Sequence, residues 1–225
     1  MAKPGSENME DWIKHHQEIG FRDIYIYHSG ILDGYTRTLE DHPIKGVHII
    51  EFPYNYEKDY TTSSYADFYR TYRHNYEWVA FINADEYIML TKEPNIQNVF
   101  QKNNYDSYEV VRLNVVQFSD YIQFTRDFDF KADAVVGEDK VVATRKMAKS
   151  IVSCKAKGLL FKSYTPTRNK KPIKQCLPNL EPVSDNSSSN RIKGVDVDKI
   201  DVSVMYVTPN QMEIRWRKWK RQRGY

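Results

Sequence analysis

The spacing of apolar residues predicts a helix near the start of the chain. Across residues 6–20, SENMEDWIKHHQEIG, the side chains repeating at three- and four-residue intervals share one helical face: Met9, Trp12, Ile13, His16 and Ile19. Asn8, with Asp11 three residues later, is a suitable start for this helix, and Gly20 a suitable end. His16 therefore faces the core, and we expect a bonded core histidine rather than a catalytic one.

Strand-like and helical segments then alternate. RDIYIYHSG (22–30) and GVHIIEF (46–52) have the pattern of short strands, residues 61–76 that of a helix, and WVAFIN (78–83) that of a third strand. YEVVRLNVVQF (108–118) and KVVAT (140–144) add strands, and the signal weakens beyond Lys155. This alternation is typical of βαβ units in a mainly parallel sheet.

The pattern thus predicts an α/β fold: one domain over residues 1–225, with a Rossmann-related, mainly parallel sheet flanked by helices. A doubly wound sheet normally begins with a strand, yet only MAKPGSE precedes the helical pattern. Either the fold begins unusually or its first strand is missing.

Composition narrows the class of protein. With 225 residues, 40% of them hydrophobic, the chain can build one domain with a substantial core. Charged residues make up 28% and the net charge is +3, which excludes a disordered tail and a polycation. No apolar run reaches the roughly 20 residues that span a bilayer, and no signal peptide opens the chain. We expect a soluble, cytoplasmic protein, any membrane anchor lying outside these residues.

The two cysteines, Cys154 and Cys176, match no zinc or redox motif. Two inert, free thiols in a reducing compartment are expected, with a single disulfide as the alternative.

The stretch WVAFINADEYIML (78–90) places two adjacent acids inside an apolar run. A buried carboxylate needs a counter-charge or hydrogen-bond donors. Asn83, Asp85 and Glu86 follow a strand, and ligands of parallel sheets bind beyond the carboxyl ends of strands. Their partner is either Mg²⁺ or Mn²⁺ carrying a diphosphate, or a salt bridge to one of the 33 basic residues. Asp33, in the loop HSGILDG, follows another strand.

Several segments, in the same order, resemble GT-A glycosyltransferases of the family 2-like and family 92-like group. They are ENMEDWIKHHQEIGFRDIYIYHSGILDG, WVAFINADEYI, KMAKSIVS and MYVTPNQMEIRWRKWKRQRG. The second resembles the segment of those proteins that holds the DxD motif. Together they cover most of the chain, so the resemblance is stronger than any single motif.

The resemblance implies roles for individual residues. Asp33 would contact the base or ribose of a nucleotide-sugar, and Asp85 would bind Mn²⁺ or Mg²⁺. Asn83 would stand at the first acid of the DxD motif, and Glu86 and Trp78 would support the nucleotide-sugar site.

The chain also departs from the family pattern. Asn83 lacks the negative charge of the usual acid. Met205 stands where those proteins have a histidine, and a thioether is a poor ligand for a hard cation. Tyr164 replaces a second histidine in a looser alignment.

The resemblance implies transfer of a sugar from a nucleotide-diphospho-sugar to a hydroxyl of a glycan or lipid-linked acceptor, as in polysaccharide biosynthesis. The catalytic residue stays unassigned, because the sequence does not choose among the acids that follow the motif: Asp120, Asp127, Asp129, Asp133, Glu138 and Asp139. The alternative is a weak or inactive module of the same fold that binds glycan, anionic membrane or protein.

A basic amphipathic helix is predicted at about 211–223. Met212, Trp216 and Trp219 form its apolar stripe, and its basic residues cover the rest: Arg215, Arg217, Lys218, Lys220, Arg221 and Arg223. The stripe can dock on the sheet, or the helix can lie on an anionic membrane at the inner face. We expect docking, and no nucleic-acid partner.

Overall fold

A computed structural model describes residues 6–28, 39, 41, 43–53, 60–84, 86–90, 92–113, 115–117, 149–161, 166–169, 171–180, 182–183 and 202–206. The helices are α1 (Ser6–Glu18), α3 (Tyr60–Tyr72) and α4 (Ile96–Asn103), with short 3₁₀ turns η1 (Arg73–Asn75) and η2 (Tyr105–Ser107). The strands are β1 (Ile24–His28), β2 (Val47–Glu51), β3 (Trp78–Phe81), β4 (Glu86–Leu90), β5 (Val110–Leu113), β6 (Val115–Gln117), β7 (Lys149–Ser153), β8 (Gln175–Cys176), β9 (Pro182–Val183) and β10 (Val202–Tyr206).

The first five predicted elements are confirmed as α1, β1, β2, α3 and β3. Gly20, the predicted end of the first helix, adopts a φ of +100°, a backbone conformation that glycine reaches without a steric penalty.

The structure differs from the predicted elements at the segment 108–118 and at helix α4. The predicted strand over 108–118 is two strands, β5 and β6, which belong to different sheets. Helix α4 was not predicted, because its eight residues are too few to show a clear period. Its ends are nevertheless marked: the Asn95 side chain accepts a hydrogen bond from the Asn98 backbone N–H, and Asn104 ends the helix with a φ of +48°. The predicted strand 140–144 and helix 211–223 lie outside the described residues.

Among the described strands, hydrogen-bonded pairs run in both directions. They form a two-stranded group β1–β2, a three-stranded group β4–β10–β6 and a five-stranded group β3–β7–β5–β8–β9. The pairs β1–β2, β10–β6 and β5–β8 are parallel, while β10–β4, β3–β7, β5–β7 and β8–β9 are antiparallel. The fold is therefore mixed α/β, and the mainly parallel sheet predicted from the sequence is not confirmed.

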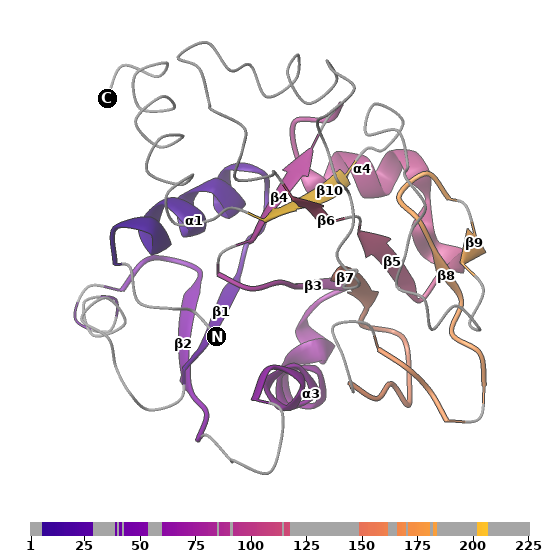
Figure 1. Cartoon of the computed structure of the whole chain (residues 1–225), viewed down its shortest axis with the longest axis horizontal. Coiled ribbons are helices and arrows are strands. Elements are labelled where there is room, and N and C mark those ends of the chain that lie inside the picture. Colours follow the sequence, from indigo (N-terminus) through magenta and orange to yellow (C-terminus); the bar gives the residue numbers. More distant parts are fainter. Residues whose placement is uncertain are drawn as a thin grey trace.

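Helices α1 and α3 lie on opposite sides of β1 and β3 (Figure 1). Trp12 and Ile13 of α1 pack against Ile24 of β1, whereas Phe68 of α3 packs against Tyr25 of β1 and Phe81 of β3. A further apolar cluster joins β4, β5 and α4 around Ile88 and Val99, which are fully buried. In the described part of the chain, no helix has both the length and the apolarity to cross a membrane.

Candidate functional site

The residues between β3 and β4 form a closed turn. The Glu86 backbone N–H donates to the Asn83 carbonyl oxygen at 3.1 Å. The Asn83 backbone N–H donates in return to the Glu86 carboxylate, at 2.7 Å from Oε2. These two bonds join the two ends of the acid-rich turn, Asn83 and Glu86.

The Glu86 carboxylate is buried and paired. Its Oε2 lies 3.0 Å from Nζ of Lys149, the first residue of β7, and the two side chains are 6% and 1% exposed. The sequence left two partners open for the acid cluster, a metal-diphosphate or a basic residue. For Glu86 the partner is the basic residue Lys149. This neutralisation leaves Glu86 poorly suited to binding a cation or an anionic substrate.

Helix α1 is hydrogen-bonded to β4, the strand that follows the turn. Trp12 Nε1 donates to the Glu86 carbonyl oxygen at 2.6 Å, and His15 Nε2 lies 2.8 Å from the Ile88 carbonyl oxygen. His16 accepts the Ile88 N–H on Nε2 at 3.3 Å, and its Nδ1 lies 2.7 Å from the Trp12 carbonyl oxygen. His16 is thus the bonded core histidine that the helical pattern predicted.

These contacts keep the His16 imidazole neutral. An acceptor at Nε2 requires the proton on Nδ1, which then donates to Trp12. Burial, followed by the charge of His15, lowers the pKa of His16 to about 3, and the bond to Trp12 opposes both effects.

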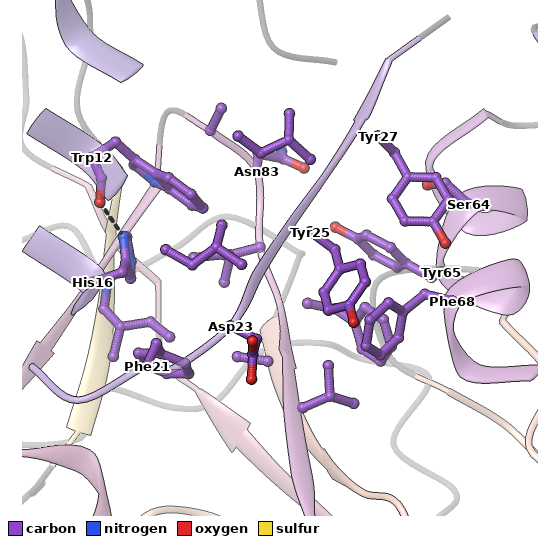
Figure 2. A pocket seen from close by; sticks show the side chains of 18 of the residues that line it. Trp12, His16, Phe21, Asp23, Tyr25, Tyr27, Ser64, Tyr65, Phe68 and Asn83 are labelled. Atoms are coloured by element: carbon purple, nitrogen blue, oxygen red, sulfur yellow. Dashed lines mark hydrogen bonds between the residues drawn. The ribbon is translucent and has the colours of Figure 1, made fainter. Parts of the chain in front are cut away.

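A cavity of about 190 Å³ lies between α1, β1, β3 and α3. Figure 2 shows Asn83 at one end of it and Phe21 with Asp23 at the other. One wall is aromatic and includes Tyr25 and Tyr27 of β1. Because Asn83 and Ala84 line the cavity, it opens toward the acid-rich turn.

The aromatic wall also carries polar groups. The Tyr27 hydroxyl donates to Asp67 Oδ2 at 3.1 Å, and burial followed by the Asp67 charge raises the pKa of Tyr27. Burial raises the pKa of Tyr60 to about 12. These hydroxyls stay protonated near neutral pH, so they can donate hydrogen bonds but do not serve as bases.

Strand β10 returns to the acid-rich turn from far along the chain. It pairs antiparallel with β4, so that Tyr206 lies opposite Glu86 and Met205 opposite Tyr87. The structure therefore brings Met205, which replaces a family histidine, to the strand next to the motif.

The structure tests the predicted site residues only in part. Asp33 and Asp85 lie outside the described residues. Trp78 begins β3, at the opposite end of that strand from Asn83, and packs edge-on against Phe100 with ring centres 4.9 Å apart. Lys149 was not identified as a site residue, although the segment KMAKSIVS that contains it had been singled out.

No group of three or more potential metal ligands occurs among the described residues. Near the turn they offer the Asn83 amide oxygen, while the Glu86 carboxylate is already engaged. Mg²⁺ and Mn²⁺ need few protein carboxylates when phosphate oxygens and water complete their coordination. The described residues alone therefore do not form a preformed metal cage.

The comparison with protein families decides the assignment. The profile of glycosyltransferase family 92 matches residues 3–171, which include α1, the cavity, the acid-rich turn and Lys149. The chain belongs to glycosyltransferase family 92. In this family 92 chain, Glu86 of the acid-rich turn contacts Trp12 of α1 and Lys149 of β7. Membership of the family supports a glycosyltransferase function. A comparison with curated proteins gives no match.

The two cysteines of this family 92 chain have the character of inert core thiols. Cys154 and Cys176 are buried and free. Burial raises the pKa of Cys154 to about 11 and that of Cys176 to about 12, so neither is a thiolate near neutral pH.

Proposed function

We propose that this chain transfers a sugar from a nucleotide-diphospho-sugar to a hydroxyl of a glycan or lipid-linked acceptor, on a GT-A-like fold. The observation that supports this most is the acid-rich turn at the carboxyl end of β3, within a chain of glycosyltransferase family 92. The nucleotide end of the donor would enter beside Asn83, and Asp33 would contact its base or ribose.

Asp85 would hold a divalent cation, Mn²⁺ or Mg²⁺, against the diphosphate. When bound, the cation would neutralise charge on the leaving diphosphate. The chain's own contribution is positional. Lys149 forms an ion pair with Glu86, and the two bonds between Asn83 and Glu86 join the ends of the turn.

The same observations support a second candidate, a weak or inactive module of the same fold. Asn83 supplies no charge, and the Glu86 carboxylate is paired with Lys149, so neither residue offers a free carboxylate to a cation. This module would bind glycan, anionic membrane or protein, with weak sugar transfer or none.

Titration calorimetry with uridine diphosphate, in Mn²⁺ and in a chelator, tests the metal-assisted site. Asp85→Ala should remove the affinity gained from Mn²⁺, on the order of tenfold or about 1.4 kcal/mol, because it deletes the carboxylate that holds the cation. The fold should survive, because Asp85→Ala removes a carboxylate and no apolar side chain. Circular dichroism checks that the fold is unchanged.

Asp106→Ala is the matched control, because Asp106 is an exposed acid on η2. It should leave the Mn²⁺-dependent gain unchanged. Equal affinity of the unaltered chain in Mn²⁺ and in chelator would refute the metal-assisted site.

A further inference from the structure

Trp78, at the far end of β3 from the acid-rich turn, lines a second cavity of the molecule. This cavity has a volume of about 680 Å³ and is lined by the start of β3, helix α4 and the residues that precede β1. Phe21 and Asp23 belong to its wall, and Figure 2 shows them at the opposite end of the first cavity from Asn83. We call this second cavity the α4 groove.

The α4 groove is remote from the proposed donor site. Trp78 precedes Asn83 by five residues, and a strand rises roughly 3.3 Å per residue, so the two lie on the order of 15 Å apart. A ligand in the groove is therefore separate from a nucleotide-sugar that enters beside Asn83.

The floor of the α4 groove is aromatic. Trp78 packs edge-on against Phe100 of α4 with ring centres 4.9 Å apart, and Phe100 packs against Tyr105 with ring centres 4.8 Å apart. Tyr105 is buried and donates its hydroxyl to the Pro178 carbonyl oxygen, whereas Trp78 and Phe100 are only half-buried. The groove therefore offers accessible ring surface from two side chains.

Polar side chains surround this aromatic floor. Three exposed amides and two exposed acids line the groove: Asn75, Gln101, Asn104, Glu77 and Asp106. Within the described part of the chain, none of these five side chains makes a hydrogen bond or an ion pair. An amide both donates and accepts, and a carboxylate accepts, so this rim can bond to hydroxyl groups in either direction.

The charges of the rim are mixed. Lys155 is exposed and lines the groove together with the acids Glu77 and Asp106, while Nε of Arg22 is 2.6 Å from Oδ2 of Asp23. A cleft that attracts a polyanion such as a nucleotide is lined by a surplus of positive charge, which this rim does not have among its described residues. The groove therefore suits an uncharged ligand that is rich in hydroxyl groups.

We propose that the α4 groove binds an uncharged oligosaccharide, a stretch of glycan that does not itself react. The apolar face of a sugar ring stacks on Trp78 and Phe100, and the hydroxyls at its edge bond to the amides and acids of the rim. The choice of a glycan rests on the proposed function, which includes a glycan among its acceptors. Held in the groove, the glycan stays at high local concentration beside the enzyme.

Nuclear magnetic resonance of the ¹⁵N-labelled chain tests the groove in a chelator and without nucleotide. The probes are uncharged oligosaccharides of glucose, galactose, mannose and N-acetylglucosamine. At least one should shift the indole N–H signal of Trp78 and the side-chain amide signals of Gln101 and Asn104. The side-chain amide of Asn83 should not respond, because it lies at the other end of β3. No shift with any probe, or shifts at Asn83 alone, would overturn the proposal.

Two variants locate the binding. Trp78→Leu keeps an apolar side chain but removes the stacking ring, and should weaken binding on the order of tenfold. Gln101→Ala removes one hydrogen-bonding group from an exposed position of α4, and should weaken binding about fivefold without disturbing the fold. Lys102→Ala is the matched control, because Lys102 is the next exposed residue of α4 and does not line the groove. Unchanged binding in Gln101→Ala, or equal weakening in Lys102→Ala, would contradict the proposal.

Asp85→Ala separates the α4 groove from the donor site. This variant should keep the oligosaccharide-induced shifts at Trp78 and Gln101 in full, since the groove needs neither the cation nor the nucleotide. Loss of those shifts in Asp85→Ala would mean that the glycan is held at the donor site, and would overturn the groove. Uridine diphosphate binding that is independent of Mn²⁺ would refute the donor site alone, so the two proposals fail separately.

Discussion

Glu86 determines the shape of the acid-rich turn, through its pairing with Lys149. A buried carboxylate is costly to desolvate, and here Lys149 forms an ion pair with it while the Asn83 backbone N–H donates to it. The pair joins β4 to β7, two strands far apart in the sequence. Loss of either charge would therefore disturb the turn as well as the core.

Lys149→Met should destabilise the chain by about 3–5 kcal/mol, because it leaves the Glu86 carboxylate buried without its counter-charge. The double change Glu86→Gln with Lys149→Met should cost less than Lys149→Met alone, since no uncompensated charge remains. Urea denaturation of the three chains measures both quantities. A double variant less stable than the single one would show that the Glu86–Lys149 ion pair does not act as described.

At the scale of elements, the junction between α1 and β4 is held by a histidine that must stay neutral. His16 donates from one ring nitrogen and accepts at the other, so protonation would break the bond from Ile88 and place a charge in the core. In the unfolded chain His16 has its ordinary pKa of 6.5, whereas in the folded chain its pKa is about 3. Between these values the unfolded state holds more protons, so the stability falls as the pH falls.

Acidification should therefore loosen α1. The His16 contribution to the free energy of unfolding should be complete above about pH 7 and reduced by about 2 kcal/mol at pH 5. His16→Gln should flatten the dependence of stability on pH in this window, while the exposed His74→Gln should retain it. Denaturation curves at several pH values provide the measurement, and an unaltered slope in His16→Gln would contradict the assignment.

At the scale of the whole molecule, two of the three strand groups, β4–β10–β6 and β3–β7–β5–β8–β9, meet at the acid-rich turn. β3 leads into it, β4 leads out, and β10 ends opposite Glu86. The segment after β10 therefore begins beside the proposed donor site. It contains residues 211–223, the predicted basic helix, which lies outside the described residues.

We predict that this helix docks through Trp216 and Trp219. Replacing both with alanine should then lower the melting temperature, because each well-buried tryptophan contributes about 3–5 kcal/mol. If the helix instead lies on a membrane, the same variant should keep its melting temperature and lose binding to anionic vesicles, a binding that salt weakens. A melting temperature unchanged by the double substitution would refute docking.

Local periodicity determined much of the amino-terminal half of the chain. The apolar repeats that mark α1, α3 and the first three strands involve neighbours a few residues apart, so they are legible in the sequence. The position of the acid-rich turn after β3 and the motifs that resemble family 92 can also be recognised in the sequence. The eight-residue α4 and the two-residue strands β8 and β9 are too short to show a period.

Tertiary structure alone decided which distant residues meet. The directions of the strand pairs, the choice of Lys149 as the partner of Glu86, and the return of β10 to β4 all depend on contacts between segments far apart in sequence. The cavity between α1, β1, β3 and α3 likewise depends on tertiary structure, because α1 and α3 cover opposite faces of β1 and β3, which belong to different groups among the described strands. Side-chain spacing indicates which faces are apolar, but burial against a particular neighbour is a property of the folded chain.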